Sequence, residues 1–128
     1  MKSFVDHIAI TVKDIDWCIR FFGEVCGMEV TRRKEIDGEL KQVWLAGGLQ
    51  FVAAPEDWQS GQPHHIGLVV ENLDTTRAKM LTYPGVESIP GQPAKWLRLP
   101  DGLVLELFDA QPGAIERMLD IDLKVIPK

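Results

Sequence analysis

Basic charge and long apolar runs are both scarce in this chain of 128 residues. Its formal net charge is −5 at pH 7, which gives no basic footprint for nucleic acid or for an anionic membrane surface. No apolar run approaches the ~20 residues that a membrane-spanning helix needs, and Asp6 and His7 interrupt the N-terminal apolar stretch where a signal peptide would continue. We therefore expect a soluble, cytoplasmic protein that binds a small molecule and has no nucleic-acid or membrane partner.

Cysteine is scarce too, with two residues in the chain. Cys18 and Cys26 fall on one expected helix, and a helical rise of ~1.5 Å per residue separates them by roughly 12 Å. That distance is too long for a disulfide bond between them. We expect both to be reduced thiols in the core.

One sequence pattern occurs twice within a length that suits a single domain. The chain is 45% hydrophobic and 26% charged, which supports one compact domain over residues 1–128 and is too short for two ordinary ones. Laying His7 over His65 also matches Ile8 with Ile66, Val12 with Val70, Asp16 with Asp74, Gly27 with Gly85 and Glu29 with Glu87. We infer two copies of one module, over residues 4–54 and 64–109, joined by the polar, turn-rich linker 55–63.

The first module has the pattern of a strand, a helix and three strands. Residues 4–12 alternate with a period of two, which predicts a strand with one aliphatic and one polar face. The aliphatic face, which we expect in the core, holds Ile8, Ile10 and Val12, and the polar face holds His7, Ala9 and Thr11. Apolar residues at helical spacing follow, from a cap at Asp14 to a stop at Gly27. Strands are expected over residues 28–35, 40–46 and 48–54, with a hairpin turn at residues 36–39.

The second module repeats this order. A strand is expected over residues 64–70, a helix capped by Asn72 over residues 73–82, and strands over residues 86–89, 95–99 and 103–108, with the last turn at residues 100–102. A short helix is expected at residues 114–119, and the tail from residue 120 carries no clear signal. The expected fold class is therefore α+β, built from two βαβββ modules.

Four polar residues hold equivalent places in the two modules. If the aliphatic residues of each strand face a helix, strand parity turns Gln50 and Glu106 to the opposite face, which also carries His7 and His65. Imidazole, carboxylate and amide oxygen together suit a borderline divalent ion such as zinc, cobalt, nickel, iron or manganese. We therefore predict a metal site formed by His7, Gln50, His65 and Glu106.

Other roles stay open for each of these residues taken alone. A single histidine on a strand is more often a hydrogen-bonded polar residue than a ligand. Glu106 could face solvent from an edge strand, and Gln50 could form a hydrogen bond within a cleft. His64 has the opposite parity to His65, so we expect it on the surface or behind the ligands. The four tryptophans could line a pocket or pack at its rim; they are Trp17, Trp44, Trp58 and Trp96.

The repeat and its motifs resemble the vicinal oxygen chelate superfamily, which includes glyoxalase I, methylmalonyl-CoA epimerase, extradiol dioxygenases and bleomycin resistance proteins. The motifs are His7 in Asp-His-Ile-Ala-Ile-Thr-Val, Gln50 in Gly-Leu-Gln-Phe-Val, His65 in His-His-Ile-Gly-Leu-Val-Val and Glu106 in Pro-Asp-Gly-Leu-Val-Leu-Glu-Leu-Phe. The resemblance covers residues 4 to about 109 and implies a glyoxalase-like curved sheet with a central metal cleft. It also implies a homodimer, because in many relatives a second copy covers sheet edges or outer helix faces.

The ligand set separates branches of this superfamily. His-Gln-His-Glu is similar to the set of methylmalonyl-CoA epimerases, whereas bacterial glyoxalase I usually has glutamate at the position of Gln50. Extradiol dioxygenases bind iron with two histidines and one carboxylate, which His7, His65 and Glu106 would supply. Bleomycin-binding relatives lack the ligands, so their presence argues against that branch.

We expect a metal-dependent lyase or isomerase of the glyoxalase I or methylmalonyl-CoA epimerase type. A divalent ion would polarise a substrate carbonyl, and Glu106 would be ligand, general base or both as the proton alpha to that carbonyl moves. Glu35 and Glu39 are weak candidates for a second acid or base. The alternatives are an iron(II) extradiol-type dioxygenase and a non-catalytic small-molecule binding or resistance protein. No residues are assigned to an organic cofactor.

Overall fold

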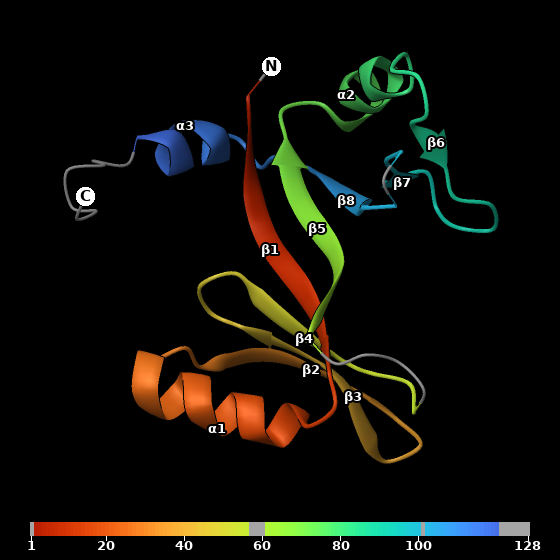
Figure 1. Ribbon diagram of the computed structural model, residues 1–128. Helices are drawn as coiled ribbons and strands as arrows, with labels where there is room; N and C mark the ends of the chain where they lie inside the picture. The colour runs from red at the N-terminus through yellow and green to blue at the C-terminus, as the bar shows by residue number, and fades with distance from the viewer. Residues whose placement is uncertain (1, 57–60, 101, 121–128) are drawn as a thin grey trace.

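The structure, a computed structural model, describes residues 2–56, 61–100 and 102–120 (Figure 1). The first module comprises β1 (Ser3–Val12), α1 (Ile15–Cys26), β2 (Val30–Ile36), β3 (Glu39–Leu45) and β4 (Leu49–Ala53). The second comprises β5 (Gln62–Val70), α2 (Leu73–Met80), β6 (Glu87–Ser88), β7 (Trp96–Arg98) and β8 (Val104–Asp109), and α3 (Ala114–Leu119) follows it. The two predicted βαβββ modules are confirmed.

The eight described strands form one sheet in the order β2-β3-β4-β1-β5-β8-β7-β6. Within each module the first strand pairs in parallel with the last, β1 with β4 and β5 with β8. The two first strands pair antiparallel with each other and so join the modules. Figure 1 shows β1 and β5 side by side, with α1 in the first module and α2 in the second on opposite sides of this junction. The sheet is curved and does not close, which confirms the predicted α+β class.

Local sequence signals set the ends of α1 and the first hairpin. The Asp14 side chain accepts a hydrogen bond from the backbone N–H of Trp17, and Gly27 ends the helix with φ 68°, a conformation that glycine adopts without steric cost. Asp37 and Gly38 join β2 to β3 with φ 52° and 79°, as an Asp-Gly hairpin turn requires. The predicted helix bounds and hairpin turn are both confirmed.

The structure moves the boundary between linker and second module. β5 begins at Gln62, so the last two residues of the predicted linker are strand, and they pair with Thr11 and Ile10. Pro63 is tolerated there because it lies near the start of the strand, beside a register shift in the β1–β5 ladder. Residues 57–60, Trp58 among them, lie outside the described residues, as do Asp101 of the predicted last turn and residues 121–128.

The second module is shorter than predicted. α2 is capped by Asn72 as expected but ends at Met80 rather than at residue 82. The hydroxyl of Thr82 donates to the carbonyl of Lys79 at 2.6 Å, and this local bond competes with continuation of the helix. β6 and β7 have only two and three residues. Of the helices that the structure describes, none is both long and apolar enough to cross a membrane.

The hydrophobic core is larger in the first module than in the second. Its buried residues are Val12, Ile15, Cys18, Val43, Leu45 and Phe51, against Val70, Leu97 and Leu107 in the second module. Cys18 is buried as predicted, but the prediction of a core thiol at Cys26 is wrong. The last turn of α1 faces solvent at that point, and the neighbouring Val25 is 68% exposed.

Ile8 is a second departure from the predicted core. It lies on the aliphatic face of β1 but is 40% exposed. α1 packs on β3 and β4, and α2 packs on β8, so the two module helices lie to either side of the junction strand. Strand parity therefore predicted the face of Ile8 correctly but not the extent to which that face is covered.

Candidate metal centre

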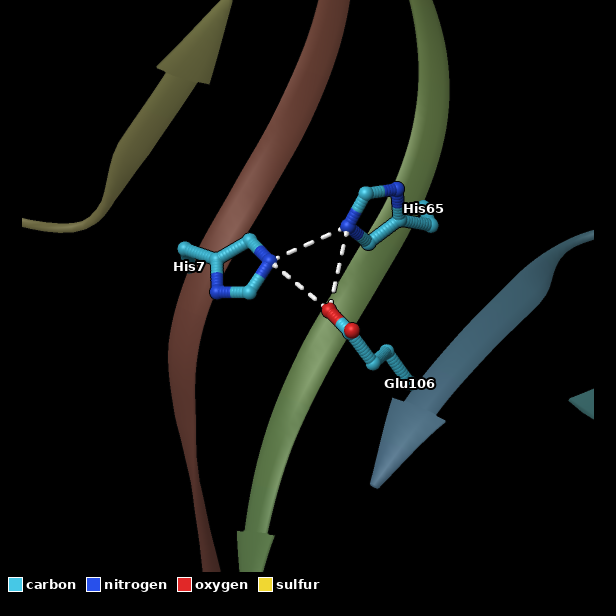
Figure 2. Close-up of side chains that lie close together, drawn as sticks. All are labelled: His7, His65 and Glu106. Carbon is cyan, nitrogen blue, oxygen red and sulfur yellow. Dashed lines mark hydrogen bonds and ion pairs between the residues drawn. The ribbon is translucent and has the colours of Figure 1, made fainter. Parts of the chain in front are cut away.

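Three buried polar side chains meet where β1, β5 and β8 lie next to one another. Figure 2 shows His7 from β1, His65 from β5 and Glu106 from β8 pointing toward a common point. The two Nε2 atoms are 3.0 Å apart, and Oε1 of Glu106 is 3.5 Å from each of them. The three residues are only 6%, 4% and 9% exposed. The structure thus brings three of the four predicted ligands together, with one donor atom of each within 4.8 Å of the others.

Small residues on the facing strand make room for both imidazoles. In the β1–β5 ladder His7 lies opposite Gly67, and His65 lies opposite Ala9. A Cβ atom on Gly67 would lie 2.3 Å from Cε1 of the His7 ring, which is inside the contact distance of two carbon atoms. Each module therefore has a histidine followed two residues later by a small residue that accommodates the other module's histidine.

A further polar group contacts each imidazole from behind. Nδ1 of His7 is 2.9 Å from Oδ2 of Asp6, and because a carboxylate can only accept, the ring donates its Nδ1–H there. Nδ1 of His65 is 2.7 Å from Nδ1 of His64. Burial, together with the neighbouring His65, lowers the pKa of His64, so His64 is neutral and can accept. With Nδ1 of each ring engaged from behind, both rings turn Nε2 toward the cluster. Nε2 is the atom through which each imidazole would ligate a metal ion or, when protonated, donate to Glu106.

Glu106 lies between the two imidazoles and a lysine. Its Oε2 is 2.8 Å from Nζ of Lys95. Burial raises the pKa of Glu106, but hydrogen bonds with His65, His7 and Lys95 outweigh burial and hold that pKa well below its usual range. The hydrogen bond with Glu106 in turn raises the pKa of His7 against the effect of burial, and Asp6 adds to the rise. Glu106 is therefore ionised at neutral pH and gives the cluster one negative charge.

Gln50, the fourth predicted ligand, is buried with one oxygen unpaired. The residue is 3% exposed, and its Nε2 donates a 2.9 Å hydrogen bond to Oε1 of Gln42. Oε1 of Gln50 has no hydrogen-bond partner among the described residues. Leaving a buried acceptor unpaired costs about 1–3 kcal/mol, and a cation in the cavity that Gln50 lines with His65 and Glu106 would remove that cost.

The donor atoms fit a divalent ion. Metal–ligand bonds of about 2.0–2.2 Å at angles of roughly 90–109° place neighbouring donors about 2.8–3.6 Å apart. The separations of 3.0, 3.5 and 3.5 Å between the His7, His65 and Glu106 donors lie in this range. Two neutral imidazoles, a carboxylate and an amide oxygen also form the mixed nitrogen and oxygen set that zinc and its neighbours accept. His7, His65 and Glu106 therefore fit such an ion, and the unpaired oxygen of Gln50 is a candidate for a fourth ligand.

A cavity of about 330 Å³ opens on the cluster, with a tryptophan from each module in its wall. The two tryptophans hold equivalent places. Trp44 pairs with Gln50 across β3 and β4, and Trp96 pairs with Glu106 across β7 and β8. These two therefore line a pocket, whereas Trp17 is 50% exposed on α1.

Most of the residues that contact the candidate ligands were not expected from the sequence. His64 lies behind His65 as expected, but Asp6, Gln42 and Lys95 were not singled out, although each contacts a predicted ligand. Asp6 could have been noticed as the chain neighbour of His7. Gln42 could have been found from hairpin register, because it lies two residues before the partner of Gln50 on the same face. Lys95 begins the strand expected over residues 95–99, where parity puts it on the same face as Leu97, whereas in the structure it precedes β7.

The two weak candidates for a second acid or base do not line the cavity. Glu35 and Glu39 are exposed on the hairpin of β2 and β3, and Glu39 forms a 2.7 Å ion pair with Lys41. Among the cavity residues that the structure describes, Glu106 is the sole carboxylate. Of the described carboxylates, Glu106 is therefore the one placed to take a proton in this cavity.

Family comparison agrees with this geometry. Residues 4–83, more than half of the chain, match the model of the Glyoxalase/Bleomycin resistance protein/Dioxygenase superfamily. The protein belongs to this superfamily. Divalent metals are commonly bound in it, and His7, His65 and Glu106 form a candidate site for one. Comparison with curated protein sequences gives no significant match.

Solved structures share the fold. A methylmalonyl-CoA epimerase in complex with methylmalonyl-CoA and NH4+ has a TM-score of 0.63 and 21% identity, covering 86% of this chain and 96% of that chain. A Streptomyces coelicolor methylmalonyl-CoA epimerase variant in complex with 2-nitronate-propionyl-CoA has a TM-score of 0.61 and 22% identity, with coverage of 84% and 94%. The 2,3-dioxygenase LapB from Pseudomonas sp. KL28 has a TM-score of 0.62 and 20% identity, with coverage of 83% and 42%. At these identities the likeness shows the fold alone.

Proposed function

We propose that the protein is a divalent-metal-dependent isomerase or lyase that moves the proton alpha to a substrate carbonyl. The observation that supports it most is the cluster of His7, His65 and Glu106, whose donor atoms are 3.0–3.5 Å apart. Gln50, with an unpaired buried oxygen, lines the same cavity. A divalent ion held by one carboxylate and three neutral ligands would keep a net positive charge, and this charge would polarise a carbonyl oxygen and acidify the adjacent C–H.

His7, Gln50, His65 and Glu106 bind the ion in this proposal, and Glu106 also takes the proton. Its two oxygens have different surroundings, since Oε1 faces the imidazoles and Oε2 faces Lys95. The contact with Lys95 weakens Glu106 as a base, so substrate must loosen that ion pair before Glu106 accepts a proton efficiently.

Metal analysis tests the first half of the proposal. Protein purified without chelator and without a nickel column should contain about one divalent ion per chain by mass spectrometry of the metal. Glu106→Ala should lower this content, and Glu87→Ala, a matched change on exposed β6, should leave it unchanged. Wild-type protein that takes up no divalent ion after reconstitution would overturn the metal assignment.

Isotope exchange tests the second half. Methylmalonyl-CoA, the ligand of one of the similar epimerases, is the first substrate to try in D₂O, with NMR to follow the alpha proton. Exchange supported by several redox-inert ions, without oxygen, is the expected result. Tight binding of carbonyl compounds without any exchange would instead favour a binding or resistance protein.

One other reaction is favoured by the same cluster. Two histidines and one carboxylate are the ligand set of non-haem iron(II) oxygenases, and the dioxygenase LapB shares the fold. Uptake of oxygen by iron(II)-loaded protein in the presence of a catechol, absent with zinc, would support a dioxygenase. Gln50 favours the isomerase or lyase, because a fourth protein ligand occupies a position that oxygen activation leaves open.

A further inference from the structure

We infer that the substrate carries a carboxylate and that Arg32 and Lys34 of β2 hold this group at the end of the cavity away from the ligand cluster. The inference names the substrate class of the proposed function and rests on that function for the reaction. The recognition of the anion itself depends only on the cavity, so it can be tested with or without metal.

Two basic side chains of β2 reach the cavity that the cluster opens into. Arg32 and Lys34 alternate along the strand, so they share one face, and both line the cavity with Gln50 and Glu106. Arg33 lies between them on the opposite face and is not part of the lining. The cavity therefore combines a metal-ligand cluster on central strands with a basic end on the outer strand β2.

The charge of Arg32 and Lys34 is not offset within the described part of the chain. A third lysine in the lining, Lys95, is 2.8 Å from Oε2 of Glu106 and is compensated by it. No described carboxylate lies within ion-pair distance of Arg32 or Lys34. Two uncompensated positive charges in a chain of net charge −5 create a local field that attracts an anion.

Arg32 is held in a geometry suited to a carboxylate. Its guanidinium carbon lies 4.7 Å from the centroid of the Trp44 ring, and the two residues are cross-strand partners. Stacking on the indole restrains the planar fork, which binds a carboxylate through two parallel hydrogen bonds. A phosphate group fits the planar fork no better than a carboxylate group does. Because the cavity is small, it favours the carboxylate, which is the smaller group.

The sheet sets the distance from the basic end to Gln50, the candidate ligand nearest to it in strand order. Arg32 pairs with Trp44, and Trp44 pairs with Gln50, so Arg32 and Gln50 are two strand spacings apart, about 10 Å between backbones. The cavity of about 330 Å³ is near the lower limit of small-molecule sites. A small oxo acid or the oxo-acid part of a larger thioester, with the carbonyl at the cluster and the carboxylate at β2, suits this arrangement.

Binding of 4-oxopentanoate and of its methyl ester tests the inference, because the two compounds share a ketone and differ in charge. Quenching of tryptophan fluorescence reports binding, since Trp44 and Trp96 line the cavity. The acid should bind about tenfold or more tightly than the ester. Arg32→Gln should weaken binding of the acid by about tenfold or more and leave binding of the ester nearly unchanged. Lys34→Gln should act in the same direction with a smaller effect.

Arg33→Gln is the matched control, because it removes the same charge from the same strand on the other face. It should change binding of the acid by less than about twofold. Equal binding of acid and ester, or equal losses from Arg32→Gln and Arg33→Gln, would overturn the inference. Arg32→Lys, which keeps the charge and removes the fork, should show an intermediate loss and serves as the test if Arg32→Gln fails to fold.

The titrations are run on metal-free and on zinc-loaded protein. Arg32-dependent binding of the acid by a chain that takes up no metal would support this inference and overturn the proposed function. Normal metal content, together with equal binding of the acid by the wild type and by Arg32→Gln, would overturn this inference without contradicting the proposed function.

Discussion

The two modules have the same order of elements, but the first is longer and has the larger core. α1 has twelve residues and α2 has eight, and β2 and β3 have seven residues each whereas β6 and β7 have two and three. The parallel pairs next to the junction, β1 with β4 and β5 with β8, are nevertheless retained in both. These inner strands carry the candidate ligands, so the modules differ most in the outer strands, which carry none of them.

At the site the modules differ in charge. The equivalent places on β4 and β8 hold an amide, Gln50, and a carboxylate, Glu106. Each has a neighbour of matching type, since Gln42 accepts from the Gln50 amide and Lys95 pairs with Glu106. One carboxylate leaves a bound divalent ion with a net charge of about +1, whereas two would neutralise it. The asymmetry between the modules would thus keep a bound ion electrophilic.

Exchanging the two ligand types is the strongest test of this asymmetry. Glu106→Gln keeps an oxygen that can ligate but removes the proton acceptor, so the variant should retain at least part of its metal while turnover falls by about 10²- to 10⁴-fold. Gln50→Glu should keep metal and lower the ion's Lewis acidity by adding a negative charge. Metal content and the rate of alpha-proton exchange, measured on the same preparations, check both.

Unchanged turnover in Glu106→Gln, with metal bound, would show that Glu106 is only a ligand. Glu87→Gln is the control, because this exposed carboxylate on β6 pairs with Arg98 away from the cavity.

The difference in core size predicts different responses to the same deletion. Leu45 and Leu97 hold equivalent places on β3 and β7, opposite Leu49 and Leu105, and are 4% and 0% exposed. Leucine to alanine in a core costs about 2–5 kcal/mol of unfolding free energy, depending on how far the site can relax. We expect the loss of unfolding free energy to lie near the upper end of this range for Leu45→Ala and near the lower end for Leu97→Ala.

The reason is the space already present in the second module. A largely apolar cavity of about 450 Å³ lies between α2 and the sheet and is lined in part by Leu105, the strand partner of Leu97. Neighbours of Leu97 can therefore move into a truncated site more easily than those of Leu45. Urea denaturation measures both losses, with Leu97→Met as a volume-conserving control below about 1.5 kcal/mol. Equal losses, or the reverse order, would contradict the expectation.

The inner fold could be predicted because its signals are local and repeated. Alternation in β1 and β5, the Asp14 and Asn72 caps and the Asp37-Gly38 turn each depend on a few adjacent residues. Burial depends instead on how helices and strands pack against one another. This is why Ile8 on β1 and Cys26 at the end of α1 were wrongly placed in the core. The lengths of β6 and β7 were overestimated. Their apolar residues have the alternation of a strand, but alternation does not show how far a partner strand extends beside them.

At the site, parity selected His7, Gln50, His65 and Glu106 as candidate ligands, because all four lie inside strands. It gave no role to Lys95, the first residue of the strand expected over residues 95–99, because parity puts Lys95 on the same face as Leu97. The negative net charge of the chain gave no sign of the basic end of the cavity. Arg32 and Lys34 belong to a run of three basic residues, which only the strand geometry of β2 divides between two faces. Contacts across the sheet, such as the one between Gly67 and the His7 ring, require the register, which the sequence does not specify.

The groups behind the two imidazoles provide a smaller test of module asymmetry. His7 is oriented by a carboxylate, Asp6, and His65 by a neutral imidazole, His64. Asp6→Asn should weaken metal binding by about 10- to 100-fold, and His64→Asn should weaken it less, because a neutral partner forms the weaker hydrogen bond. Competition with a chromophoric chelator measures both affinities. Asp16→Asn, on α1 outside the cluster, is the control, and a loss there as large as in Asp6→Asn would argue against orientation as the cause.

The outer face of α1 has no counterpart on α2 and leads to the last prediction. Trp17, Phe21 and Val25 follow one another at a spacing of four and are 50%, 40% and 68% exposed, with the rings of Trp17 and Phe21 stacked at 4.9 Å. On the described residues of α2 no large apolar side chain is exposed to a similar degree. We expect a homodimer that buries this stripe of α1, because apolar side chains at helical spacing favour association with another apolar surface.

Light scattering at micromolar concentration should give twice the chain mass of 14.4 kDa. Trp17→Ser combined with Phe21→Ser should give the monomer while changing the stability of each chain by about 0.5 kcal/mol or less per site, since both side chains are exposed in the single chain. A monomeric wild type would contradict the dimer. A dimer that survives the double change would place the interface elsewhere, with Val5 and Ile8 on β1 as the next exposed apolar residues to replace. Because neither change touches the cavity, metal content should stay constant, and a loss of metal on dissociation would mean that the second copy helps to form the site.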